Sequence, residues 1–157
     1  EVWHRYIDVN LGSVFRLSRQ AVKEMESGGS VVNIASVFGL VGFRGSSPYS
    51  AAKAGVIGLT RQMAADYSRR GIRFNAVAPG IIETPATADR IRNNRWLTRA
   101  MVDTAPIGRT GKPSDVAEAV YFLASEAASF ITGVVLPVDG GWTATRYYPD
   151  LEEQQNA

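Results

Sequence analysis

The chain has 157 residues, 45% of them hydrophobic and 20% charged, and a net charge of +2. This balance is typical of one globular domain and excludes a disordered or fibrous chain. The absence of cysteine and the single histidine exclude disulfides, a thiolate nucleophile and a metal site built on thiolate or histidine ligands. Basic residues are scattered and do not interleave with aromatic ones, so we expect no nucleic-acid partner.

No apolar run approaches the roughly 20 residues that cross a bilayer, and no segment resembles a signal peptide. We therefore expect a cytoplasmic protein without a membrane partner. The chain begins at Glu1 and enters a periodic pattern at once. This start indicates a truncated chain, which we expect to be an excerpt of a longer polypeptide; the alternative is that the missing strands come from a separate chain.

The first part of the chain predicts a helix followed by a buried strand. Apolar residues recur at spacings of three and four between positions 7 and 25, as on one helix face, and Gly28 ends the helix. Residues 31–35 form a short, β-branched, nearly continuous apolar run. Such a run suits a parallel strand buried on both faces, and Ser36 stands where this strand ends.

A second helix and strand follow. Pro48 fits the first turn of a helix that runs to residues 69–71. The strand over 72–77 starts at once and ends at Pro79-Gly80. A Pro-Gly pair is by itself common in turns, so without further context it marks only the end of a strand.

Residues 81–112 are less regular and carry four arginines around Trp96, namely Arg90, Arg92, Arg95 and Arg99. A solvated helix face explains these arginines most simply, and contact with an acidic substrate or a carrier phosphate is the alternative. Pro113 then opens a third helix, and a third strand over 134–138 precedes Asp139-Gly140-Gly141. A polar tail over 142–157 closes the chain, and its aromatic residues Trp142, Tyr147 and Tyr148 either touch a neighbouring subunit or fray.

The alternation of helix and strand predicts an α/β fold, with a parallel sheet covered by helices and right-handed crossovers. Ligands of such sheets bind beyond the carboxyl ends of the strands. Ser36, Pro79-Gly80 and the 139–141 segment all stand at such ends. We therefore expect a site there.

Tyr49 and Lys53 are four residues apart on the second helix, so their side chains share one face. An ammonium beside a phenol favours the phenolate, which would make Tyr49 a usable proton carrier. Such a pair in isolation is more simply a surface contact. Ser36 could donate to a carbonyl oxygen while Tyr49 transfers the proton, or it could be an ordinary turn residue. Asn10 is locally unfavourable inside a helix, where it would be either functional or a helix-bending polar residue.

Asn10, Ser36 and Tyr49-Ser50-Ala51-Ala52-Lys53 closely resemble the active-site tetrad of short-chain dehydrogenases/reductases. The blocks at 9–12, 32–36, 71–80 and 132–141 are similar to family blocks in the same order. The resemblance implies the C-terminal part of a three-layer, Rossmann-like doubly wound sheet. It also implies one domain over 1–141, with a substrate lid at 81–112.

The resemblance implies a role for each member of the tetrad. Tyr49 would act as general acid or base, and Ser36 would hold the substrate oxygen. Lys53 would bias the phenol and bind the nicotinamide ribose. Asn10 would hold a water that continues the proton relay.

The resemblance also implies NAD or NADP as the cofactor. Pro79, Gly80, Ile82 and Thr84 would embrace the nicotinamide. The family's N-terminal Gly-rich nucleotide loop is absent. Gly39, Gly42 and Gly45 lack the spacing of that fingerprint, so their loop would instead line the substrate cleft.

The activity implied is hydride transfer between a nicotinamide cofactor and a small secondary alcohol or its ketone, similar to 3-oxoacyl-carrier-protein reductases or to small polyol and sugar dehydrogenases. A lyase or epimerase that uses the same tyrosine is a second reading. A non-catalytic partner subunit that serves as an assembly surface is a third. Family members pair their first two long helices between subunits, which implies a homo-oligomer, a dimer of dimers.

Overall fold

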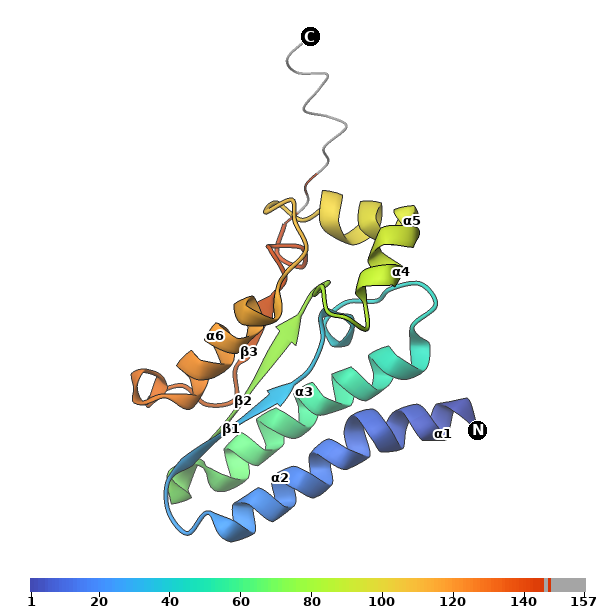
Figure 1. Ribbon diagram of the computed structural model, residues 1–157. Helices are drawn as coiled ribbons and strands as arrows, with labels where there is room; N and C mark the ends of the chain where they lie inside the picture. The colour runs from blue at the N-terminus through green and yellow to red at the C-terminus, as the bar shows by residue number, and fades with distance from the viewer. Residues whose placement is uncertain (146, 148–157) are drawn as a thin grey trace.

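A parallel sheet in the order β1-β2-β3 separates two helical layers (Figure 1). The computed structural model describes residues 1–145 and 147. The strands are β1 (Gly29–Ile34), β2 (Ile72–Pro79) and β3 (Val135–Val138). Residues 29–34 pair in parallel with 72–77, and 76–79 pair with 135–138. The α/β class and the parallel sheet that the sequence predicts are confirmed.

Two long helical segments cover one face of the sheet. The first consists of α1 (Val2–Ile7), the π-helical η1 (Asp8–Gly12) and α2 (Ser13–Glu24), which follow one another without a break. The second is α3 (Ser47–Tyr67). The single regular helix expected around Asn10 is thus interrupted by a π-helical turn, a feature that often marks functional sites.

The opposite face is covered by α6 (Pro113–Ala124). Arg73 on β2 donates from its guanidinium to the carbonyl oxygens of Leu123 and Ser125 at 2.7 and 3.0 Å. These carbonyls lie at the end of α6, where no further helical turn provides donors. The arginine therefore anchors the helix terminus to the sheet.

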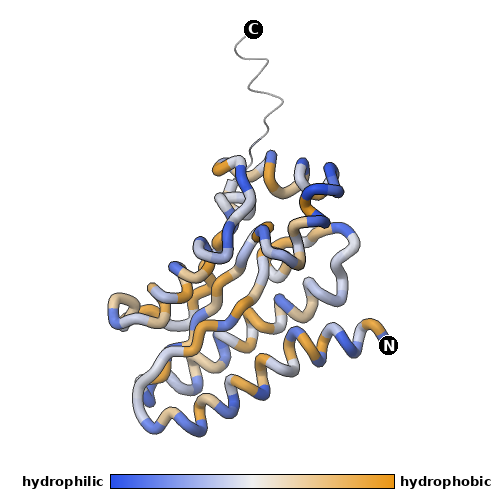
Figure 2. Tube along the Cα trace, viewed as in Figure 1, coloured by the Kyte–Doolittle hydropathy of each residue, from blue (hydrophilic) through white to orange (hydrophobic). Residues whose placement is uncertain are grey.

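Every second residue of β2 points toward the layer of α2 and α3 and forms the core there. Ile72, Phe74, Ala76 and Ala78 are completely buried and pack with side chains of α2 and α3. Figure 2 shows hydrophobic residues running along the strands, whereas hydrophilic residues recur along α2. Burial of this apolar surface is the main force that assembles the layers.

Segment 81–112 contains short helices that stand beyond the carboxyl ends of the strands (Figure 1). These are α4 (Ala88–Asn93), α5 (Arg95–Thr98) and the π-helical η4 (Arg99–Asp103). Trp142 packs against this group and donates its indole N–H to the Ala100 carbonyl at 2.8 Å. Trp142, the first residue of the tail expected over 142–157, thus packs against these short helices, and Tyr148 lies outside the described residues.

Three short 3-10 turns complete the structure: η2 (Val37–Gly39), η3 (Ser68–Arg70) and η5 (Glu126–Ala128). Among the described residues, no helix combines the length and the apolar character that crossing a bilayer requires.

Asn75 connects β2 to the segment that leads into β3. It is completely buried, donates to the Ile131 carbonyl at 2.9 Å and accepts from the Val134 N–H at 3.1 Å. Asn75→Ala would leave both backbone groups without a partner, so we expect the free energy of unfolding to fall by about 2–4 kcal/mol. Denaturant unfolding of the full-length protein measures this loss. Asn93→Ala, at an exposed position, is the control, and an equal effect of both variants contradicts the assignment.

Candidate active site

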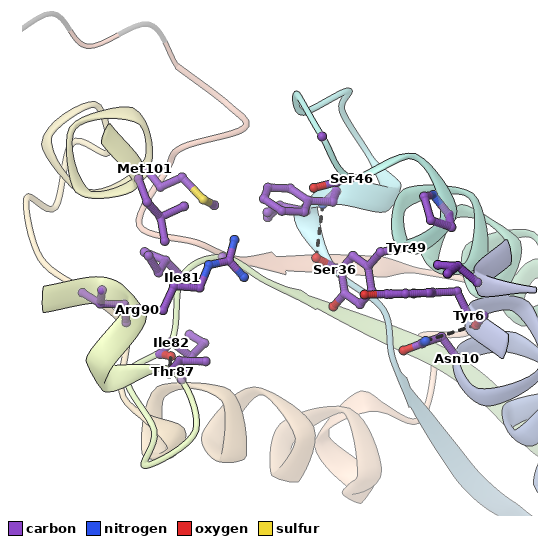
Figure 3. Close-up of a pocket in the computed structure, with 18 residues that line it drawn as sticks. Tyr6, Asn10, Ser36, Ser46, Tyr49, Ile81, Ile82, Thr87, Arg90 and Met101 are labelled. Carbon is purple, nitrogen blue, oxygen red and sulfur yellow. Dashed lines mark hydrogen bonds between the residues drawn. The ribbon is translucent and has the colours of Figure 1, made fainter. Parts of the chain in front are cut away.

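A cleft of about 700 Å³ opens at the carboxyl ends of the strands (Figure 3). Of the site residues predicted from the sequence, five line it: Asn10, Ser36, Tyr49, Gly80 and Ile82. They come from η1, the end of β1, the start of α3 and the segment after β2. The fold therefore brings together residues that are up to about 70 positions apart in the chain. Pro79, Lys53 and Thr84 are not among the lining residues of this cleft.

Ser36 leaves β1 in an extended conformation and is 8% exposed. Its hydroxyl oxygen accepts the backbone N–H of Phe38 at 3.2 Å. A serine hydroxyl has one proton to donate in addition to its acceptor capacity. Since the N–H of Phe38 uses the oxygen as an acceptor, the hydroxyl proton is available to an acceptor in the cleft.

Tyr49 lies in the first turn of α3, with Lys53 one turn further along. The Lys53 ammonium is 5.7 Å from the centroid of the Tyr49 ring and donates to the Ile34 carbonyl at 2.9 Å. Burial lowers the pKa of Lys53, because a low-dielectric environment disfavours the charged form. The ring of Phe38 also meets that of Tyr49 edge-on, with the centroids 6.3 Å apart.

Asn10 occupies the middle of the π-helical turn η1. Its amide nitrogen donates to the Tyr6 carbonyl at 3.1 Å, as Figure 3 shows. Asn10 lines the cleft and also a neighbouring cavity of about 380 Å³ between α2 and β1, which Lys53 lines as well. Two members of the predicted tetrad therefore meet in this second cavity.

The segment after β2 presents groups that fit a nicotinamide. The N–H of Glu83 donates to the Gly111 carbonyl, and the N–H of Gly111 donates to the Ile81 carbonyl. The backbone N–H of Ile82, which lies between these two bonds, therefore points away from Gly111. It has no partner among the described residues. A free backbone N–H can donate to the carbonyl oxygen of a carboxamide, and a hydroxyl oxygen nearby can accept from its NH2 group. The residues present therefore fit the nicotinamide half of a dinucleotide.

Thr84 is held in a local hydroxyl network. Its hydroxyl lies 2.9 Å from that of Thr87, and Thr87 also donates to the Ile82 carbonyl at 2.7 Å. Thr87, which the sequence did not single out, lines the cleft. The spacing of three residues between the two threonines at the start of a helix is the signal that could have indicated it.

Gly39 is a second position whose importance the sequence did not reveal. A Cβ at Gly39 would lie 2.7 Å from the carbonyl carbon of Lys53 and 2.8 Å from its oxygen. The turn after Ser36 thus rests directly on the backbone of α3. By contrast, Gly42 in the same loop has open space around it, and Gly45 lines the cleft as expected.

The family model described as enoyl-(acyl carrier protein) reductase matches residues 1–143. The chain is 48% identical over 144 residues to cis-4-hydroxycyclohexanecarboxylate dehydrogenase of Sinomonas cyclohexanicum, which covers 90% of the chain and 57% of that protein. It is 44% identical over 143 residues to a 3-oxoacyl-(acyl-carrier-protein) reductase of Thermotoga maritima, with the same coverage of 90% and 57%.

Solved structures agree with this relationship. A crystal structure from Agrobacterium tumefaciens with bound NADP has a TM-score of 0.87 at 40% identity, over 91% of this chain and 59% of that one. A 4-hydroxyisoleucine dehydrogenase complexed with NADH has a TM-score of 0.82 at 38% identity, over 89% and 58%. The chain belongs to the short-chain dehydrogenase/reductase family, and it spans a little more than half the length of these relatives.

Replacement of Gly39 tests the contact that joins the Ser36 turn to α3. Gly39→Ala would force the turn away from the Lys53 backbone, and we expect the free energy of unfolding to fall by about 1–3 kcal/mol. Gly42→Ala in the same loop meets no neighbour and should change it little. Denaturant unfolding of both full-length variants makes the comparison, and an unaltered stability of Gly39→Ala would show that the contact is not tight.

Proposed function

We propose that the full-length protein is an NAD(P)-dependent oxidoreductase that interconverts a small secondary alcohol and its ketone, with Tyr49 as general acid and base. The observation that carries this proposal is the shared cleft of Ser36 and Tyr49, with the Lys53 ammonium 5.7 Å from the tyrosine ring. Family membership supports the same chemistry.

Ser36 and Tyr49 would both act on the substrate oxygen. In the direction of reduction, the free hydroxyl proton of Ser36 binds the carbonyl oxygen and polarises it. Tyr49 then gives its phenolic proton to that oxygen as negative charge develops there. The nicotinamide, when bound, supplies or accepts the hydride.

Lys53 and Asn10 would return a proton to Tyr49. The Lys53 ammonium stabilises the phenolate by its charge. The second cavity, which both residues line, also carries the polar side chains of Ser13, Ser18 and Asn33. A cavity of this size with several polar groups in its lining can hold ordered water. We propose that water held by Asn10 connects Lys53 to solvent.

The nicotinamide would be held at the segment after β2. Pro79 and Gly80 end the strand, the Ile82 N–H is free to donate to the carboxamide, and the hydroxyl pair of Thr84 and Thr87 lies beside it. Tyr49 and Lys53 would bind the ribose hydroxyls. The choice between NAD and NADP depends on the adenosine half of the site, and relatives occur with each cofactor.

The substrate class follows from chemistry that the relatives share. A 3-oxoacyl thioester and a hydroxycyclohexane differ in size, but each presents one secondary alcohol or ketone carbon to the cofactor. Segment 81–112 would close over such a substrate as a lid, because Ile91, Leu97 and Met101 face the cleft from it. Closure of this kind excludes water from the reacting atoms.

The assembly we propose is a homo-oligomer, a dimer of dimers, in the cytoplasm. Trp3 and Phe15 on the first helical segment are 50% and 46% exposed. A second copy of the same segment would cover these apolar side chains, as an isologous interface requires. Sedimentation of the full-length protein tests the oligomeric state.

Tyr49→Phe tests the proton transfer. Phenylalanine keeps the ring packed against Phe38 but removes the transferable proton, so we expect turnover to fall by at least about a hundredfold with little change in cofactor affinity. Turnover is followed by the absorbance of the reduced nicotinamide. Tyr67→Phe, on the same helix, is the control, and retained turnover in Tyr49→Phe would overturn the assignment.

Lys53→Met separates a catalytic lysine from a structural one. The ammonium is partly desolvated, so its removal should leave the free energy of unfolding within about 1 kcal/mol of the wild type while turnover is lost. Lys23→Met, at an exposed position on α2, should alter neither quantity. A large loss of stability in Lys53→Met without a selective loss of turnover contradicts the proposed role.

A further inference from the structure

Arg90 reaches into the cleft from the side of the lid. It is carried by α4, and Figure 3 shows its guanidinium extending between Met101 and the side on which Ser36 and Tyr49 lie. Among the described residues that line the cleft, Arg90 is the only one with a charged side chain. Arg90 is exposed, and it gives the cleft one positive charge opposite the proposed proton donors.

The neighbouring arginine on α4 behaves differently. Arg92 pairs with Asp89 at 2.6 Å, and its side chain is 67% exposed, as the solvated-face interpretation predicts. Arg90 has no ion pair or hydrogen bond with any described residue. The two arginines thus share a short helix, but only Arg90 offers a free guanidinium to the cleft.

The surroundings of Arg90 make an uncharged occupant unfavourable. Most of the other cleft residues of the lid are apolar, and Thr87 is the one polar residue among them; the apolar ones are Ile81, Ile82, Ile91, Leu97 and Met101. A ligand that fills the cleft takes water from the guanidinium, and a buried charge without a partner is costly. An anionic group on the ligand offsets this cost and makes charge-assisted, bidentate hydrogen bonds with the planar fork of an arginine.

We infer that Arg90 binds a carboxylate on the substrate and so selects hydroxy acids and oxo acids over neutral alcohols and ketones. A single guanidinium balances the one charge of a carboxylate, whereas a phosphate dianion would leave one negative charge without a cationic partner, because Arg90 is the only charged described residue that lines the cleft. This inference rests on the proposed function for the position of the reacting carbon. Arg90 acts here as a specificity-determining residue and takes no part in proton transfer.

Binding of matched probes tests the inference without turnover. The full-length protein saturated with NADP would be titrated calorimetrically with cyclohexanecarboxylate and with the neutral cyclohexanecarboxamide. Arg90→Met should weaken binding of the carboxylate by about tenfold or more and leave the amide unchanged. Arg92→Met is the matched control from the same helix and should leave both affinities as in the wild type.

Turnover provides a second readout with 4-oxocyclohexanecarboxylate and cyclohexanone. Arg90→Met should raise KM for the oxo acid by about tenfold or more while kcat/KM for cyclohexanone stays the same or rises. An effect of Arg90→Met on NADP affinity would assign the arginine to the cofactor and overturn the inference. So would a wild-type protein that binds the carboxylate no more tightly than the amide.

The two proposals fail in different ways. Tyr49→Phe should abolish turnover and still bind cyclohexanecarboxylate with wild-type affinity. If Tyr49→Phe keeps its turnover, the proposed proton transfer is wrong and the calorimetric comparison alone decides the role of Arg90. If Tyr49→Phe is inactive and Arg90→Met binds both probes normally, the oxidoreductase proposal stands and the carboxylate site is refuted.

Discussion

The contact between Gly39 and the backbone of Lys53 fixes the two halves of the candidate site against each other. Only a hydrogen atom fits at Gly39, because a Cβ there would approach the Lys53 carbonyl carbon to 2.7 Å. Lys53 in turn donates to the Ile34 carbonyl at the end of β1. These two contacts join the strand, the turn and the helix, and Ser36 and Tyr49 on this unit line the same cleft.

A second close approach adds Asn10 to this unit. A Cβ at Gly55 on α3 would lie 2.6 Å from the side chain of Leu11, the residue after Asn10. Asn33 on β1 is 6% exposed and donates to the hydroxyl of the completely buried Thr60 on α3 at 3.0 Å. Buried polar groups need such partners and so restrict how neighbouring elements can slide. The π-helical turn at Asn10 is therefore held in register with Tyr49 and Lys53.

Periodicity predicted most of the fold, because the strands are short apolar runs, of which β2 is buried on both faces, and the long helices carry apolar residues at helical spacing. The positions of Ser36 and Gly80 followed from the rule that ligands bind at strand ends. The π-helical turn could not be predicted, since one extra residue hardly disturbs a pattern of threes and fours. The sequence did not distinguish Gly39 from an ordinary loop glycine. It also did not distinguish Arg90 from Arg92, because a six-residue helix is too short for its sequence to show which side faces a cleft.

The open edge of β1 shows how the chemistry of this chain depends on its surroundings. Within the described residues β1 pairs only with β2, so its other edge offers unpaired backbone groups. The cavity shared by Asn10 and Lys53 runs along this strand, and Ile34 there is 46% exposed. A further strand beside β1 would cover the cavity and remove Lys53 further from bulk water. Greater burial disfavours an isolated ammonium, so the charge that assists Tyr49 would then rely on the Ile34 carbonyl and on hydroxyl groups of a bound ribose.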